Sequence, residues 1–200
     1  MRHRRKGRRL GRSSSHRKAL MKNLATALFL TRRDPDFFTG MFQSDGKTEV
    51  KPPRFPGRIV TTLHKAKETR PMIEKCITIA KDVLPNLAEA EKHGTTAERN
   101  TGEWKKWRES DNHKKWAAAM APVVNARRRV FAMLRDNEAV RILFNEIAPE
   151  MADRNGGYTR ILHMANVRLG DAGKQAIIEL VGTEYDRVKK TSQKPEFASE

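Results

Sequence analysis

The sequence predicts an α+β fold that carries an extended, basic N-terminal arm. Apolar residues recur at helical spacing in several stretches, and short segments rich in β-branched residues lie between and after them. The charge is also uneven, because twelve of the 41 Lys and Arg residues precede Asp34, the first acidic residue. A chain of 200 residues has room for one domain with additions, or for two small domains.

The first thirty-three residues hold 12 of the 17 net positive charges. A block of like charges cannot collapse on itself, so residues 1–12 are expected to be a disordered arm in free solution. The unopposed charge and a pI near 10.4 indicate a polyanionic partner, and the abundance of arginine favours nucleic acid over a membrane surface. A secretion or transit signal is disfavoured, since no apolar run with a small-residue cleavage site follows.

A first helix is expected from Ser13 or Ser14, either of which can cap its N-terminus. Its apolar stripe would consist of Leu20, Leu24, Ala27 and Leu28. Residues 34–57 are expected to be a loop, because prolines, glycines and an SDG turn interrupt any periodicity. That loop should fold back on an apolar surface or dock on a partner through Phe37, Phe38, Met41 and Phe42. Residues 58–62 are β-rich and predict a short strand.

The next helix is predicted over residues 63–84, with Thr62 as its cap and a kink or break at Pro71. The expected buried stripe is Ile73, Cys76, Ile77, Ala80 and Leu84. The single cysteine excludes an internal disulfide, favours a cytosolic compartment and is interpreted as a small buried hydrophobe. Residues 85–116 are expected to interrupt the helical pattern. Trp104 and Trp107 in this segment could stack on bases or form the core of a short helix.

Further helices are predicted over residues 117–134 and 138–153, separated by a break and cap at 135–138. The apolar anchors of the first are Val123, Val124, Val130, Phe131 and Leu134. Those of the second are Val140, Leu143, Phe144, Ile147 and Met151. Residues 154–157 should stop that helix. Residues 158–168 and 175–181 then predict two strands of a hairpin, and residues 183–200 a flexible tail.

Several classes of function are disfavoured. The longest apolar run is far below the roughly 18 residues of a membrane helix. No cysteine or carboxylate pattern accompanies His93 and His113 at metal-ligand spacing. A nuclease would need paired carboxylates, and here Asp136 and Glu138 are better explained by capping. A DNA-binding protein remains an alternative, because the helices that meet at 135–138 could mimic a helix-turn-helix, although no dimer seam is evident.

Four blocks resemble the bacterial large-subunit ribosomal protein family numbered seventeen. They are MRHRRKGRRLGRSSSHRKALMKNLA at 1–25, IVTTLHKAKETR at 59–70, NARRRVFAMLRDNEAVRILFNEIAP at 125–149 and RNGGYTRILHMANVRLGDAGKQAIIELV at 154–181. The first and last are the most specific. Typical relatives are shorter, so residues of about 31–54 and 82–122 are expected to be insertions. Both are close to neutral, which favours contacts with a neighbouring protein, or simple surface elaboration, over contacts with RNA.

The resemblance implies a two-layer α/β domain at 13–182, in the order helix, strand, helices and two-stranded hairpin, preceded by the arm at 1–12. It implies a structural constituent of the large ribosomal subunit, in the bacterial cytoplasm, that binds and stabilises folded ribosomal RNA near the nascent-chain exit. Neighbouring ribosomal proteins, including the one numbered thirty-two, would be partners. It implies no catalytic activity, and we expect no cofactor, metal, membrane or homo-oligomer. The alternative is a non-ribosomal DNA- or RNA-binding protein.

The resemblance and the charge together predict three sets of RNA-binding residues. The first set lies on the arm and the first helix: Arg2, His3, Arg4, Arg5, Lys6, Arg8, Arg9, Arg12, His16, Arg17, Lys18 and Lys22. The second is Arg127, Arg128 and Arg129, and the third is Arg154, Tyr158, Arg160 and Arg168. Tyr158 could stack on a base or pack on the sheet. Most contacts would be made to phosphate and sugar, so RNA would be recognised by its shape.

Overall fold

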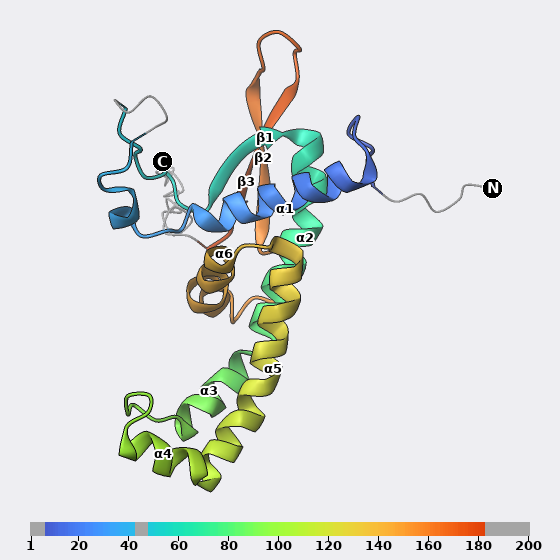
Figure 1. The fold of residues 1–200 in the computed structure, drawn as a ribbon. Helices are drawn as coiled ribbons and strands as arrows, with labels where there is room; N and C mark the ends of the chain where they lie inside the picture. Colours follow the sequence, from blue (N-terminus) through green and yellow to red (C-terminus); the bar gives the residue numbers. More distant parts are fainter. Residues whose placement is uncertain (1–6, 43–47, 183–200) are drawn as a thin grey trace, which may run out of the picture.

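A computed structural model describes residues 7–42 and 48–182 of the chain. It has a small antiparallel sheet with helices on one face and a long helical projection that leads away from the sheet (Figure 1). Helices α1 (Ser14–Leu30) and α2 (Leu63–Lys81) pack against each other and against the sheet. The predicted α+β class is therefore confirmed. The expected tail at 183–200 lies outside the described residues.

The sheet has the strand order β1-β3-β2, with every neighbouring pair antiparallel. Its strands are β1 (Arg58–Thr62), β2 (Thr159–Val167) and β3 (Lys174–Leu180). Both Ile59 and Ile161 pair with Ile178, and this row packs on the hydrophobic core. The next row, centred on Ile177, places Val60 and Leu162 on the opposite, exposed face. The alternation of side chains along each strand thus confirms the predicted strand and hairpin.

Helix α1 begins at the predicted position, where the hydroxyl of Ser13 accepts a hydrogen bond from the His16 amide. Its buried residues are Ala25, Leu28 and Phe29. Ala27 is exposed, so its predicted place on the apolar stripe was wrong. The spacing alone left the rotation of the helix open, and the large Phe29 side chain, which is fully buried, occupies the core side instead.

Helix α2 carries four of the five residues of the predicted stripe, since Ile73, Cys76, Ile77 and Ala80 are all buried. The helix ends at Lys81, earlier than predicted, so Leu84 begins α3 instead and is half-buried. Burial raises the pKa of the Cys76 thiol to about 12, in keeping with its interpretation as a small hydrophobe. The helix runs unbroken through Pro71, so the alternative of a split helix is wrong. Pro71 and Lys67, whose carbonyl loses its helical partner, both lie on the exposed side, where water can satisfy that carbonyl.

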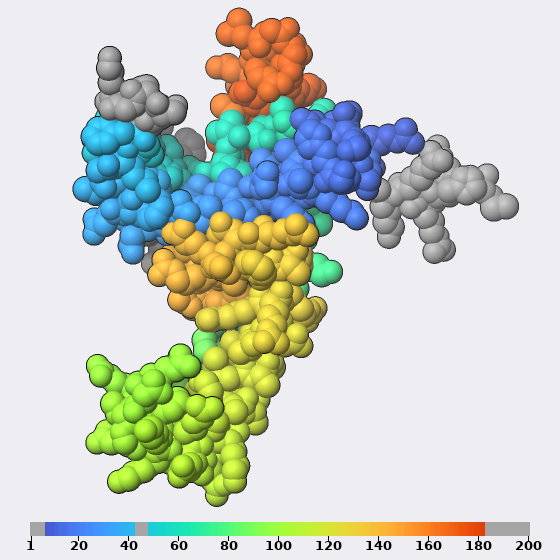
Figure 2. Space-filling view, viewed as in Figure 1, coloured from blue at the N-terminus to red at the C-terminus, as the bar shows by residue number. Residues whose placement is uncertain are grey.

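Residues 85–116 are mostly helical, with a loop at 94–101, which corrects the predicted interruption. They form α3 (Leu84–His93), α4 (Gly102–Glu109) and the first turn of α5 (Asp111–Leu134). The indole N–H of Trp107 donates to the His93 carbonyl at 3.1 Å, and its ring packs edge-on against Trp116. These contacts join the three helices, so for Trp107 the short-helix interpretation is confirmed. They lie near the tip of a projecting lobe that coincides with the second expected insertion (Figure 2).

The break at 135–138 is confirmed. Arg135 ends α5 in a left-handed conformation, and the Asp136 carboxylate accepts from the Ala139 amide at 2.7 Å. The following helical run comprises α6 (Asn137–Ile142), a π-helical turn η2 (Leu143–Ile147) and α7 (Ala148–Glu150). All of its predicted anchors are buried, namely Val140, Leu143, Phe144, Ile147 and Met151.

The predicted loop at 34–57 contains a single 3-10 turn, η1 (Pro35–Phe38), among its described residues. Its aromatic cluster does not fold back, because Phe37, Met41 and Phe42 are exposed. The loop is fixed at its end by Gly57, which has a positive φ of 77°. The Gly57 amide donates to the Thr31 hydroxyl at 2.8 Å and its carbonyl accepts from Leu180 at 2.9 Å. Gly57 thus ties the loop to the end of α1 and to the sheet.

Glu74 fastens α2 to the start of β2. Its carboxylate accepts from the amides of Tyr158 and Thr159 at 3.2 and 3.0 Å, and from the Thr159 hydroxyl at 2.6 Å. Partial burial raises the pKa of Glu74, but the hydrogen bonds from Thr159 and Tyr158 outweigh it and hold the pKa below its ordinary value of 4.5.

We therefore expect Glu74→Gln to lower the free energy of unfolding by about 1–3 kcal/mol at pH 7. Because the folded pKa is lowered, the carboxylate's contribution is fully present above the ordinary pKa and is lost as the pH falls through the folded value. The difference between variant and wild type should shrink accordingly in urea unfolding at acidic pH. Glu103→Gln, at an exposed position in α4, is the matched control and should leave stability within about 0.5 kcal/mol.

Candidate nucleic-acid interface

The described end of the arm is a turn rather than an extended segment. Leu10 and Gly11 have positive φ angles, and the guanidinium of Arg12 donates to the Leu10 carbonyl at 2.8 Å. Arg8 pairs with Glu68 of α2 at 3.0 Å, which holds the turn against that helix. Residues 7–12 therefore differ from the disordered arm expected there. Of the predicted arm contacts, Arg2, His3, Arg4, Arg5 and Lys6 lie outside the described residues.

The arm turn, α2 and the hairpin meet at a basic cleft of about 520 Å³. Five Lys and Arg side chains and one imidazole line it, and they come from three distant parts of the sequence: Arg8, Arg12, His64, Lys65, Arg168 and Lys174. The N-terminus of α2 lies in the same cleft, and Thr62 makes no side-chain cap there. A helix N-terminus adds a positive potential to that of the side chains. Such a cleft is suited to holding phosphate groups.

Sequence reasoning missed His64, Lys65 and Lys174 as parts of this cleft. His64 and Lys65 belong to the family-like block at 59–70 and lie in the first turn of α2. Their positions in the sequence do not indicate that the arm lies beside them. Lys174 begins β3 and pairs with Val167 across the hairpin. Only the folded chain shows that these three residues share a surface with the arm.

The cations of α1 continue this surface. Arg17 and Lys18 line a second hollow with Arg8, and they have no ion-pair partner among the described residues. Lys22 donates to the Ala132 carbonyl at the end of α5 at 3.1 Å. His16 is exposed on the first turn of the helix. The predicted set on α1 thus lies along one path from the arm turn toward α5.

The second predicted set lies on the last turns of α5. Arg127 donates to the Asn145 side chain at 3.4 Å and lies over the Phe144 ring at 5.3 Å. Arg128 and Arg129 are exposed and form no salt bridge within residues 7–42 and 48–182. The partners of Arg127 are neutral, so all three arginines keep their charge available to a ligand.

The third set behaves differently from the prediction. Tyr158 is only 3% exposed and belongs to the hydrophobic core, so it cannot stack on a base, and the sheet-packed alternative is correct. Arg160 pairs with the buried carboxylate of Glu179. Arg168 binds Asp171 at the hairpin turn, and this side-chain hydrogen bond lowers the pKa of Asp171 to about 2. Arg154 remains exposed.

No group of three or more His, Cys, Asp or Glu side chains within the described residues could hold a metal ion. None of the helices built from those residues combines the length and apolar character that a membrane span requires. The geometry therefore defines a basic α+β protein whose cations are spread over clefts and helix faces, as in proteins that lie along a polyanion.

The family profile described as Ribosomal protein L17 matches residues 56–181. The large ribosomal subunit protein bL17 of Rhodopirellula baltica is 55% identical over 197 residues, covering 98% of this chain and 88% of the relative. The bL17 proteins of Desulfotalea psychrophila and Chlorobium limicola are 37% and 35% identical, covering 93% and 87% of this chain and 92% and 72% of their own lengths. The chain belongs to the ribosomal protein L17 family.

Membership confirms the resemblance seen in the sequence and identifies a structural, non-enzymatic protein of the bacterial large ribosomal subunit. Its place is therefore the ribosome, in the cytoplasm. The alternatives of a nuclease and of a non-ribosomal DNA-binding protein lose their support. The alignment with the relative from Rhodopirellula baltica spans nearly the whole chain.

Proposed function

We propose that the chain binds and stabilises folded ribosomal RNA near the nascent-chain exit of the large subunit. The observation that carries this proposal is the basic cleft, where five Lys and Arg side chains, the His64 imidazole and the N-terminus of α2 surround one carboxylate that is already paired. The position near the exit, and a contact with the neighbouring protein numbered thirty-two, follow from the family resemblance.

The cleft and the α1 cations would hold phosphates of RNA strands that approach from different sides. Since Arg8 and Arg12 lie on the arm turn and Lys174 on the hairpin, one bound strand would bridge segments far apart in the sequence. Such contacts fix the register of folded RNA without reading its bases. The rest of the arm would become ordered on binding, so its loss of conformational entropy would occur during assembly.

The projecting lobe has a different role in this proposal. The segment from Asp82 to Trp116 contains seven basic and seven acidic residues, so the lobe has no net charge that would attract RNA. The aromatic cluster around Trp107 stiffens it. We infer that the insertion at 82–122 extends the protein toward a neighbouring ribosomal protein.

Sedimentation of the tagged protein from a cell lysate tests the proposal. We expect co-migration with the large subunit that survives a wash at moderate salt, because many phosphate contacts dissociate together only at higher salt. The purified protein should also prefer structured large-subunit RNA to duplex DNA of the same length. Release at low salt together with equal affinity for duplex DNA would reduce the protein to a general polyanion binder and overturn the proposal.

A further inference from the structure

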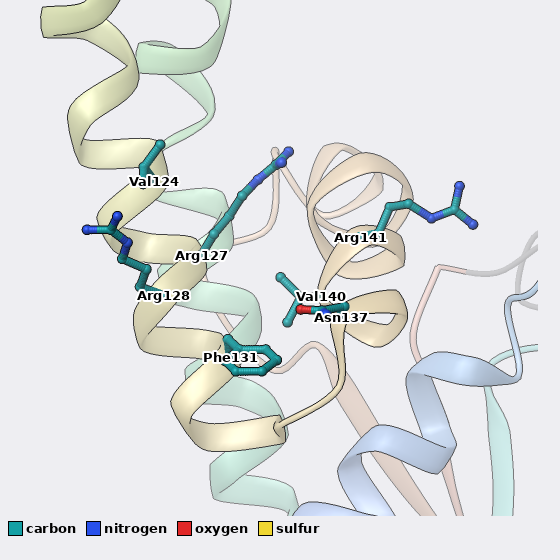
Figure 3. Close-up of a pocket in the computed structure, with 7 residues that line it drawn as sticks. All are labelled: Val124, Arg127, Arg128, Phe131, Asn137, Val140 and Arg141. Carbon is teal, nitrogen blue, oxygen red and sulfur yellow. The ribbon is translucent and has the colours of Figure 1, made fainter.

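A cavity of about 430 Å³ lies between α5 and α6 (Figure 3). Its apolar wall consists of Val124 and Phe131 from α5 and Val140 from α6. Phe131 is 41% exposed and Val124 is 38% exposed, so their predicted place in the core was wrong. The other three predicted anchors of helix α5, Val123, Val130 and Leu134, are buried. The volume falls within the range of roughly 300–1,000 Å³ found for ligand pockets.

The mouth of the cavity is cationic. Figure 3 shows the Arg127 side chain extending from α5 across the gap toward α6, while Arg128 and Arg141 point outward on opposite sides. Asn137, in the first turn of α6, adds an amide that can both donate and accept. The described residues that line the cavity include no carboxylate. A ligand that fits this lining has an apolar, flat part and an anionic part.

The cavity also continues the surface proposed to bind RNA. A neighbouring hollow is lined by Lys18 and Lys22 of α1 and by Arg135 at the end of α5. Arg135 is followed within two residues by Asn137 of the cavity, and the hydrogen bond from Lys22 to Ala132 joins α1 to the last turn of α5. An RNA strand that leaves the arm turn along α1 would therefore reach the mouth of the cavity.

We propose that this cavity holds an unpaired base of the ribosomal RNA. The base would stack on the Phe131 ring, Asn137 would contact its edge, and the adjoining phosphates would lie against Arg127 and Arg128. Stacking of splayed bases on aromatic side chains is a common way for proteins to hold single-stranded RNA. An apolar side chain of a protein partner could also pack on the apolar wall, but it would bring no anion to the three guanidinium groups of the cavity. The proposal rests on the proposed function, because it assumes that RNA is the polyanion.

The test compares two RNA probes with the purified full-length protein at one salt concentration. One probe is an unpaired strand of about twelve nucleotides, a length within the site sizes known for single-strand binders, and the other is the same strand paired with its full complement as a blunt-ended duplex. Phe131→Leu keeps the apolar volume and removes the aromatic face. We expect it to weaken binding of the unpaired probe about 5- to 100-fold, as for the loss of one stacked base, and to leave binding of the duplex unchanged.

Arg128→Ala and Arg129→Ala form a matched pair, because both are exposed on adjacent positions of α5 and only Arg128 lines the cavity. Arg128→Ala should weaken binding of the unpaired probe more than binding of the duplex, whereas Arg129→Ala should weaken binding of both equally. If Phe131→Leu changes the affinity for both probes equally, or for neither, binding of a base in the cavity is refuted, while RNA binding by the protein is not. If neither probe binds in a salt-dependent way, the proposed function itself fails.

A photoreactive phenylalanine analogue at position 131, incorporated into assembled large subunits, identifies the occupant directly. Cross-linking to one unpaired nucleotide of the ribosomal RNA is the expected result. Cross-linking to a neighbouring protein would show that the cavity docks a peptide segment and would overturn the proposal.

Discussion

Deletion of residues 1–12 should weaken binding to large-subunit RNA and flatten its salt dependence. The deletion removes seven Lys and Arg residues. Each cation that neutralises a phosphate contributes about one unit to the slope of log affinity against log salt, so the slope should fall by about five to seven units. Wild-type protein with that many contacts should lose roughly 10³- to 10⁵-fold in affinity between 50 and 200 mM salt, and the truncated protein far less.

The measurement is a titration of labelled large-subunit RNA at several salt concentrations with both proteins. Deletion of residues 183–200 is a suitable control, because it removes four basic and four acidic residues and so leaves the net charge unchanged. Its slope should equal that of the wild type. A slope that stays the same after loss of the arm would mean that residues 1–12 contact no phosphate.

The second large effect is expected at the centre of the sheet. Glu179 of β3 is 1% exposed and lies between Arg58 of β1 and Arg160 of β2, its register partners on either side. The Arg58 Nε lies 2.6 Å from one carboxylate oxygen, and the Arg160 Nε donates to the other at 2.5 Å. The three side chains therefore bind all three strands together on the face of the sheet that the helices leave open.

Replacing both arginines by methionine leaves the Glu179 charge buried without these two partners. We expect the double variant Arg58→Met/Arg160→Met to lose about 3–5 kcal/mol of unfolding free energy, more than the sum of the single variants. The melting temperature should fall by roughly 6–20 °C, at about 2–4 °C per kcal/mol for a chain of this size.

Adding Glu179→Gln to the double variant separates the loss of charge pairing from the loss of arginine packing. The buried charge is then removed, so most of the stability should return in thermal and urea unfolding. A double variant within about 1 kcal/mol of the wild type, or a triple variant no more stable than the double, would show that the two arginines do not compensate the Glu179 charge.

Local patterns predicted the elements well where one short-range signal dominated. The caps at Ser13 and Asp136, the stripe from Ile73 to Ala80 and the alternation along the hairpin all concern neighbours within a few residues. The prediction for residues 85–116 was wrong because it also relied on short-range signals alone. Pro85 and two glycines, Gly94 and Gly102, signalled a break, but packing of α3 along α5 and the Trp107 contacts stabilise short helices that propensity alone would not favour.

The site was predicted in part. Charge density along the chain pointed to the arm and α1, and the quoted blocks contained Arg127, Arg128 and Arg129. Phe131 was predicted as an apolar anchor, but α5 turns Val130 and Leu134 toward the core and leaves Phe131 exposed beside α6. Tyr158 is the opposite case: it was a candidate for stacking on an RNA base, but its ring is buried in the core.

The sequence by itself determined the class of fold, the concentration of positive charge and the family, since each depends on composition or on motifs that are contiguous in the sequence. The tertiary structure alone decided which charges act together. Arg8, Lys65 and Lys174 meet in one cleft, whereas Arg160 is neutralised by Glu179. The physical reason is that electrostatic interactions depend on distances of a few ångströms in space, and these distances are set by the packing of segments and the pairing of strands that are not neighbours in the sequence.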